Sequence, residues 1–348
     1  MKKVIIIGGG FAGSYIAKNL EKSSEVTLID NKDYFEFTPG ILRTIVDPEH
    51  IKKIQAFHND YLKKAKVLIG QVKEINDKCV IINKEKIEFD YLVICSGSSY
   101  YLPIKEKNIV IAARANHIGS YYNKIKDAKK ITIVGGGLVG VELSAEIVTN
   151  YKNKEVVLID DKSKVMERTP EKASAYAEKF LRKNKVILVY NEQVIEYTPV
   201  IITDKGKRIE ADLVFLCTGI IPNSDFLEKN FKNILNENKY VMVNEHLQVL
   251  NYSNIFAAGD VNNTEVEKTA QNAIQQAKII ISNIRALEKN KVLKKYAQRK
   301  TPLVISLGKW DGVFIFHDIV VHGFIPGLMK TIIEKWEMKV MYRKRKKY

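Results

Sequence analysis

Cysteine is scarce in this sequence of 348 residues, which contains three, at positions 79, 95 and 217. No two of them have the CxxC or CxxxxC spacing of a redox-active pair, and an odd number argues against a disulfide framework. Cys95 and Cys217 each end an apolar run typical of a strand, where a small buried side chain is favoured over a redox role. We therefore expect chemistry that does not depend on a pair of thiols.

Long apolar runs are also absent, so the sequence predicts no membrane-spanning helix. We find no signal peptide before the first predicted strand, and Lys2 stands where N-myristoylation requires glycine. Acidic residues are outnumbered, with 40 Asp and Glu against 56 Lys and Arg, which gives a formal net charge of +16. This excess suggests an acidic partner, either nucleic acid or an anionic membrane, although a solvated lysine-rich surface explains it equally well.

Two segments of the chain resemble each other. Residues 2–8 and 129–135 each consist of a basic lead-in, a β-branched strand and a glycine. Each is followed by a helical pattern and then by a second strand that ends in an acid, Asp30 or Asp160. Such βαβ units predict parallel sheets with helices packed against them.

Domain organisation follows from this repeat. The sequence predicts an α/β protein with two Rossmann-like dinucleotide-binding domains, the second inserted in the first, and a small C-terminal module. We expect residues 1–112 and 243–300 to form the first domain, because residues 254–260 read as a further strand of it. Residues 113–242 are then the second domain, and residues 301–348 are the C-terminal module.

Each unit contains the glycine pattern GxGxxG, at residues 8–13 and 135–140. The first glycine permits a tight turn, the second lets the backbone approach a pyrophosphate, and the third lets the helix pack closely on the strand. The helix N-terminus offers free N–H groups to phosphate, and the acid accepts hydrogen bonds from a ribose hydroxyl. One copy alone is a weak signal, but two copies in the same context argue against ordinary glycine-rich turns.

The two sites need not bind the same ligand. Gly259-Asp260 follows a strand of the first unit, where an aspartate can hold a ribityl or phosphate hydroxyl of a flavin. The first site is therefore interpreted as a flavin site and the second as the site of an exchangeable nicotinamide nucleotide. Asp160 is followed by Asp161, and two acids would repel a 2′-phosphate, so we expect NADH rather than NADPH.

With these motifs the chain resembles, over nearly all its length, the FAD-dependent pyridine nucleotide-disulfide oxidoreductases. That resemblance implies FAD and a nicotinamide nucleotide as cofactors. The predicted FAD contacts are Gly8, Gly10, Phe11, Ala12, Gly13, Asp30, Gly259 and Asp260, and the predicted nicotinamide nucleotide contacts are Gly135, Gly137, Gly140, Asp160 and Gly219. Val72, Ser96 and Gly97 are predicted to bind a cofactor as well. Residues 35–43 match the stretch in which disulfide reductases carry their redox-active cysteines, but contain none, so electrons must leave the flavin directly.

Two segments resemble one branch of this family. Residues 270–276 are similar to the AQxAxQ signature of type II NADH:quinone oxidoreductases, and Gln271 and Gln275 share one helix face. Their amides suit quinone carbonyls, whereas the alternative is a polar helix with solvated glutamines. Residues 306–313 resemble a strand of the type II enzymes and of the ferroptosis-suppressor-protein-like branch. This resemblance implies a quinone as electron acceptor.

Glu142 matches a glutamate that lies near the contact between nicotinamide and flavin in the type II enzymes. The resemblance implies that its carboxylate orients the nicotinamide or relays protons. The alternative interpretation is an acid early in a helix, favoured there by the helix dipole.

The C-terminal module is rich in large apolar residues, but His317, Asp318, His322 and Pro326 interrupt them. After Pro326 a helical pattern places Leu328, Ile332, Trp336 and Val340 on one side, before the basic residues 343–347. Apolar groups beside a basic cluster suit a peripheral anchor on anionic lipid, whereas the alternatives are packing on the body or a homodimer interface. No zinc-ligand spacing and no nucleic-acid-binding signature is present, so we expect neither metal nor specific nucleic acid.

These features predict an NADH:quinone oxidoreductase that passes a hydride from NADH to flavin and then two electrons to a membrane quinone, without pumping protons. We expect it in the cytoplasm, peripherally associated with the inner face of the cell membrane. The alternatives are a ferredoxin- or rubredoxin-type reductase and an interaction protein resembling apoptosis-inducing factor.

Overall fold

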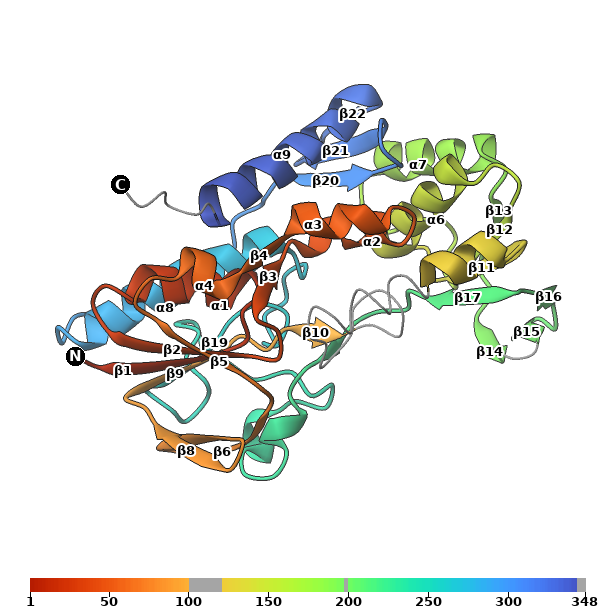
Figure 1. Cartoon of the computed structure of the whole chain (residues 1–348). Helices are drawn as coiled ribbons and strands as arrows, with labels where there is room; N and C mark the ends of the chain where they lie inside the picture. The colour runs from red at the N-terminus through yellow and green to blue at the C-terminus, as the bar shows by residue number, and fades with distance from the viewer. Residues whose placement is uncertain (100–120, 197–199, 343–348) are drawn as a thin grey trace.

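A computed structural model of the protein describes residues 1–99, 121–196 and 200–342 (Figure 1). The domain boundary predicted near residue 112 and the basic residues 343–347 lie outside the described residues. Among the residues described, no helix is both long enough and apolar enough to cross a bilayer.

A five-stranded parallel sheet forms the first unit, in the order β19-β9-β1-β2-β5. Its strands are β1 (Lys3–Ile7), β2 (Glu25–Asp30), β5 (Lys66–Ile69), β9 (Tyr91–Ile94) and β19 (Ile255–Ala257). Helices α1 (Phe11–Leu20) and α8 (Ala270–Leu287) pack on one face, and the antiparallel sheet of β6 (Val72–Ile75), β7 (Cys79–Ile82) and β8 (Glu85–Glu88) lies on the other. Alternation along β1 explains the burial of both faces, since Val4 and Ile6 pack with the helices while Ile5 and Ile7 pack with β6 and β7.

The second unit repeats this plan. Its parallel sheet has the order β13-β12-β11-β17, from β11 (Lys130–Val134), β12 (Glu155–Ile159), β13 (Ile187–Val189) and β17 (Leu213–Leu216). Helices α6 (Leu138–Asn150) and α7 (Glu171–Lys183) cover one face, and the antiparallel strands β14 (Val194–Glu196), β15 (Val200–Thr203) and β16 (Arg208–Glu210) pack on the other. The predicted α/β class with two Rossmann-like units is confirmed.

A short antiparallel pair, β10 (Ser98–Ser99) and β18 (Ile221–Pro222), joins the two units. Beyond β18, the 3₁₀ turns η3 (Asp225–Leu227) and η4 (Lys232–Ile234) place Leu227, Phe231 and Ile234 in the core beneath the first sheet. We therefore propose that the chain returns to the first domain near residue 222, earlier than the predicted residue 243. The sequence did not predict this boundary, because the segment that follows β18 forms short 3₁₀ turns and lacks the alternating apolar pattern of a strand.

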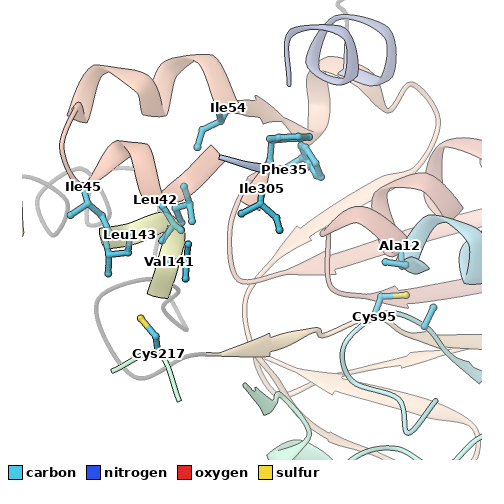
Figure 2. Packing of buried hydrophobic residues seen from close by; sticks show 14 of the residues in the cluster. Ala12, Phe35, Leu42, Ile45, Ile54, Cys95, Val141, Leu143, Cys217 and Ile305 are labelled. Atoms are coloured by element: carbon cyan, nitrogen blue, oxygen red, sulfur yellow. The ribbon is translucent and has the colours of Figure 1, made fainter. Parts of the chain in front are cut away.

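The C-terminal module is an antiparallel sheet of β20 (Leu303–Ser306), β21 (Gly312–Phe316) and β22 (Ile319–His322), followed by α9 (Phe324–Tyr342). Its strands contact α6 and α7 of the second unit, whereas α9 contacts short elements of the first. Those elements include α3 (Ile51–Ile54), β4 (Gln55–Phe57) and α4 (His58–Tyr61). They follow β3 (Tyr34–Glu36), η1 (Thr38–Gly40), α2 (Ile41–Thr44) and η2 (Pro48–His50) in the chain. Figure 2 shows the shared core at this junction, where Leu42 of α2 and Ile45 just after it approach Val141 and Leu143 of α6.

Candidate functional site

A cavity of about 470 Å³ opens at the carboxyl ends of the first sheet's strands, which is where α/β proteins bind their ligands. The first glycine turn, the start of α8, strand β20 and helix α9 all contribute to its wall. The predicted site residues that line it are Gly8, Gly10, Phe11, Ala12, Asp30, Val72, Ser96, Gly97, Glu142, Gly259, Asp260 and Gln271. Residues from distant parts of the sequence thus meet around one space.

The first glycine turn is built around two backbone contacts. Gly8 has φ +101°, and a Cβ there would overlap the carbonyl oxygen of Cys95. A Cβ on Gly13 would overlap the carbonyl oxygen of Gly8, so helix and strand could not approach as they do. A Cβ on Gly10 would meet nothing within 4 Å, and no side chain caps the N-terminus of α1. The chain therefore leaves open space beside free N–H groups, which fits a pyrophosphate.

Asp30 is held at the same turn. Its Oδ2 accepts a hydrogen bond from the backbone N–H of Gly9, and its Oδ1 accepts one from the N–H of Lys32 at 2.8 Å. His58 lies behind it, fully buried, with Nδ1 at 2.6 Å from the Tyr61 hydroxyl and Nε2 at 3.9 Å from Asp30 Oδ2. Burial lowers the pKa of His58 despite the opposing charge of Asp30, so the ring is neutral at pH 7. Sequence reasoning did not find His58, because no local pattern links it to the turn.

The second glycine turn has the same geometry. A Cβ on Gly135 would come within 2.5 Å of the carbonyl oxygen of Cys217, and one on Gly140 would overlap the carbonyl oxygen of Gly135. A Cβ on Gly137 would meet nothing within 4 Å, and α6 begins without a side-chain cap. Gly219 has φ +125° and open space beside it. This turn also fits a dinucleotide, although its glycines do not line the cavity of the first unit.

Asp160 occupies the position that corresponds to Asp30. Its Oδ2 accepts a hydrogen bond from the N–H of Gly136, and its Oδ1 accepts one from the N–H of Lys162 at 2.8 Å. Burial raises the pKa of Asp160, whereas hydrogen bonds to Asp160 and Lys162 lower the pKa of the exposed Asp161. The end of β12 therefore presents negative charge to the solvent side of this turn.

Hydrogen bonds from side chains hold the loop that follows β19 in place. Gln276 is buried, and its Oε1 accepts hydrogen bonds from the N–H of Gly259 at 2.7 Å and from Asn262 Nδ2 at 2.9 Å. Asp260 Oδ2 accepts a hydrogen bond from Ser98 Oγ at 2.7 Å. Half-buried Lys268 lines the cavity beside them and donates to the carbonyl oxygens of Asn262 and Thr264, and burial lowers its pKa.

The glutamines of α8 differ from the sequence prediction in one respect. Gln271 is exposed and lines the cavity, but Gln275 is half-buried and does not line it. One helical turn, about 5.4 Å, separates the two, and the cavity ends before the second is reached. Gln276, which sequence reasoning did not single out, supports the Gly259 loop instead.

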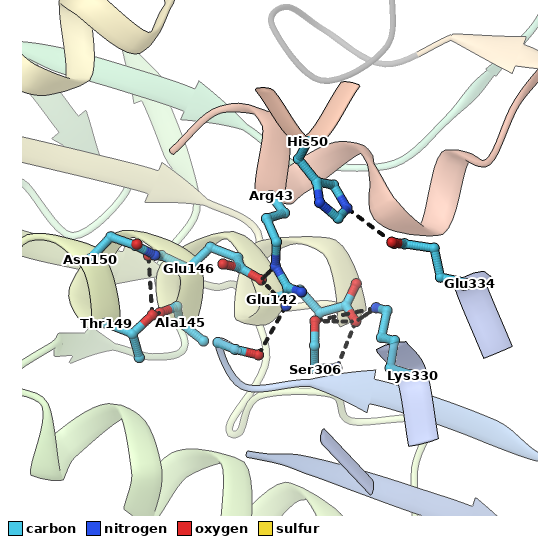
Figure 3. A network of polar contacts seen from close by, with 11 residues as sticks. Arg43, His50, Glu142, Ala145, Glu146, Thr149, Asn150, Ser306, Lys330 and Glu334 are labelled. Atoms are coloured by element: carbon cyan, nitrogen blue, oxygen red, sulfur yellow. Dashed lines mark hydrogen bonds and ion pairs between the residues drawn. The ribbon is translucent and has the colours of Figure 1, made fainter. Parts of the chain in front are cut away.

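Glu142 projects from α6 into the cavity, where Figure 3 shows it surrounded by donors. Its Oε1 accepts hydrogen bonds from Ser306 N at 2.8 Å, from Ser306 Oγ at 3.1 Å and from Lys330 Nζ. Its side chain is 12% exposed and that of Lys330 15%. Glu142 is thus bound by the C-terminal module, a feature that the helix dipole alone does not explain.

Two further side-chain pairs, one partly buried and one buried, join the same parts of the chain (Figure 3). Arg43 of α2 donates to Glu146 of α6 at 2.9 Å, and His50 Nε2 lies 3.1 Å from Glu334 of α9. Sequence reasoning missed these residues, because the partners lie 103 and 284 positions apart.

Of the three cysteines, only Cys95 lines the cavity. All three are free and buried, as predicted for Cys95 and Cys217, and burial raises the pKa of Cys95 and raises that of Cys217 to about 12. A neutral, buried thiol is a poor nucleophile. Among the described residues, no group of three or more His, Cys, Asp or Glu side chains could hold a metal ion.

The chain is similar to known proteins over most of its length. The family model of pyridine nucleotide-disulphide oxidoreductases matches residues 2–277. Apoptosis-inducing factor homolog B of Dictyostelium discoideum is 34% identical over 344 residues, which cover 90% of this chain and 89% of that protein. Ferroptosis suppressor protein 1 of Homo sapiens is 31% identical over 350 residues, which cover 95% of this chain and 92% of that protein.

Two solved structures share the fold. The sulfide:quinone oxidoreductase of Aquifex aeolicus has a TM-score of 0.83 at 19% identity, covering 99% of this chain and 92% of that one. NDH2 of Plasmodium falciparum in complex with NADH has a TM-score of 0.80 at 16% identity, covering 99% of both chains. The likeness extends over the C-terminal module as well as the two units.

Proposed function

The chain belongs to the pyridine nucleotide-disulphide oxidoreductase family, and on this premise we propose that it carries electrons from NADH, through FAD, to a quinone. The family makes it an FAD- and NAD(P)-dependent oxidoreductase; the donor and the acceptor are the proposal. One observation carries it: a cavity in which the first glycine turn, Glu142, Gln271 and the wall of β20 and α9 meet without a redox-active cysteine.

Support for FAD in the first unit comes from the open space at Gly10, the uncapped start of α1 and the fixed carboxylate of Asp30. When bound, FAD supplies the redox chemistry. The chain's own contribution is to bind and orient it. Leu138 and Val139, which follow the second glycine turn, line the same cavity, so a nucleotide bound at that turn would reach towards it.

Support for a quinone comes from the remaining wall of the cavity. Ile274, Leu303 and Ile333 offer apolar surface, and Gln271 offers an amide that can donate to a carbonyl oxygen. A neutral ring with two carbonyls and an apolar tail matches this combination. Among the structures with this fold, the Aquifex enzyme is named a sulfide:quinone oxidoreductase.

Of the two roles proposed for Glu142, its surroundings favour orientation. An oxygen that accepts hydrogen bonds from Ser306 and Lys330 suits a fixed carboxylate. Such a carboxylate can orient the carboxamide of a nicotinamide.

We expect NADH to be preferred over NADPH by at least about tenfold in kcat/KM, equivalent to about 1.4 kcal/mol. The acids at residues 160 and 161 would repel a 2′-phosphate. Steady-state kinetics with both donors measure the preference, and Asp161→Asn should narrow it by raising activity with NADPH. A wild-type protein that prefers NADPH would contradict this assignment.

Exposed apolar residues on helix α9 support the proposal that the protein contacts a membrane. Its outer residues Phe324, Ile325, Leu328, Ile332 and Trp336, here called the α9 apolar face, are 39% to 64% exposed. Trp310 stacks on Phe324 at 6.0 Å between ring centroids and extends the same surface. We propose that this face lies on anionic lipid, because the net charge is +16 and a quinone tail resides in the bilayer.

Replacing Ile325 and Ile332 together by Glu is expected to lower binding to vesicles that contain phosphatidylserine by at least about tenfold, about 1.4 kcal/mol. Each carboxylate would have to enter the interface in place of an apolar group. Vesicle sedimentation measures binding, and turnover with a short-chain quinone should stay unchanged. Val292→Glu is the matched control, since Val292 is 93% exposed but lies outside α9.

Equal vesicle binding by the double variant and the wild type would end the lipid proposal. If light scattering showed instead that the wild type is a dimer and the double variant a monomer, the α9 apolar face would be a homodimer interface.

A further inference from the structure

A second carboxyl group lines the part of the cavity that the quinone would occupy. Lys330, Ile333 and Glu337 are spaced by three and four residues on α9, so they share the face that lines the cavity wall. Trp336 of the α9 apolar face is next to Glu337 in the chain and is 57% exposed. Glu337 therefore stands where the cavity meets the outer surface of α9.

The surroundings of Glu337 differ from those of Glu142. Within the described part of the chain, its carboxyl group makes no hydrogen bond or ion pair, and its side chain is half-buried. Burial raises the pKa of Glu337, and the charge of Lys278 on α8 opposes that rise. The other ionisable groups on elements packed against this part of α9 are Lys52 and Lys53 on α3, His58, Asp60 and Tyr61 on α4, His322 on β22, and Lys330, Glu334, Lys335 and Lys339 on α9 itself.

The chemistry of the proposed reaction requires a proton donor. Reduction of a quinone to a quinol takes up two electrons and two protons. With NADH as the donor, the hydride brings both electrons and one proton, and the second proton must come from solvent. The other acids of the cavity have partners of their own. Asp30 accepts hydrogen bonds from N–H groups of the first turn, Asp260 accepts one from Ser98, and Glu142 accepts one from Lys330. Glu36 and Asp225, which also line the cavity, are likewise engaged in polar or electrostatic contacts.

We propose, on the basis of the quinone reductase function above, that Glu337 delivers this second proton. Its O–H bond breaks as an O–H bond forms on the reduced quinone oxygen, and the resulting carboxylate takes a proton from water. The position between cavity and surface gives the carboxyl group access to both the substrate and the solvent. Burial keeps the protonated form available at higher pH than for an exposed glutamate.

Rapid mixing of the NADH-reduced holoenzyme with a short-chain quinone tests the proposal, with oxidation followed by flavin absorbance. Glu337→Gln should slow this step by about a hundredfold, the lower end of the usual contribution of general acids. Glu337→Asp should restore part of the rate. Flavin content and the rate of reduction by NADH should remain those of the wild type. Glu237→Gln, at an exposed turn, is the control for loss of one acid.

Two further readouts separate proton delivery from a structural role. The wild-type rate should fall as pH rises through the raised pKa of Glu337, whereas the Gln variant should lose this dependence. Oxidation by ferricyanide, which takes electrons without protons, should be equally fast in wild type and variant.

An unchanged quinone rate in the Gln variant, or an equal loss of rate with ferricyanide, would overturn the role of Glu337. A wild-type protein that NADH reduces but that reacts with no quinone would overturn the proposed function, and this inference with it.

Discussion

Gly13→Ala is expected to destabilise the protein by about 3 kcal/mol or more and to remove bound FAD, because its Cβ would overlap the carbonyl oxygen of Gly8. The carbonyl group belongs to the backbone and the position of a Cβ is fixed by its own backbone, so neither can move aside by changing rotamer. Urea unfolding of the apoprotein and the flavin absorbance of the purified variant measure the two effects. The variant should fold poorly even when no flavin is present.

Gly10→Ala is the matched variant, because its Cβ would meet no protein atom within 4 Å. We expect wild-type stability of the apoprotein but FAD affinity weaker by at least about tenfold, about 1.4 kcal/mol. The new methyl group would occupy the space that the proposal gives to the pyrophosphate. Titration of the apoprotein with FAD, followed by flavin fluorescence, gives the affinity. Wild-type affinity in Gly10→Ala would show that the open space at this turn does not hold the cofactor.

The second large effect is expected at the second turn and on a different ligand. Gly137→Ala should raise KM for NADH by at least about tenfold, about 1.4 kcal/mol, while the flavin content stays at one per chain. A Cβ on Gly137 would meet no protein atom within 4 Å, so the fold of the second unit should tolerate it. Dithionite should reduce the bound flavin as in the wild type, because it bypasses the nucleotide site.

Gly140→Ala supplies the structural comparison for this turn, since its Cβ would overlap the carbonyl oxygen of Gly135. It should destabilise the second unit and abolish reduction by NADH. Loss of flavin from Gly137→Ala, or of NADH binding alone from Gly10→Ala, would mean that the two turns hold the opposite ligands.

The sequence alone predicted those parts of the site whose residues lie close together in the chain. The strand, the glycine turn and the following helix occur within a dozen residues, so residues 3–13 and 130–140 could be recognised without a structure. The apolar side of α9 was equally recognisable, because side chains four positions apart lie on one helix face.

Long-range partners could not be predicted in this way. Glu142 meets Lys330 across 188 positions, and neither residue carries a local signal of the other. Helical periodicity placed Gln271 and Gln275 on one face but could not show where the cavity ends. His58 of α4 lies beside Asp30 of the first glycine turn only in the folded chain, and the sequence around His58 resembles no motif that would have predicted this.

The central claim is tested most directly by NADH oxidation in the absence of oxygen, measured on the purified flavoprotein with and without a short-chain quinone. We expect turnover that depends on the quinone and consumes one NADH for each quinol formed. The account would be contradicted if NADH reduced the bound flavin once and no quinone reoxidised it.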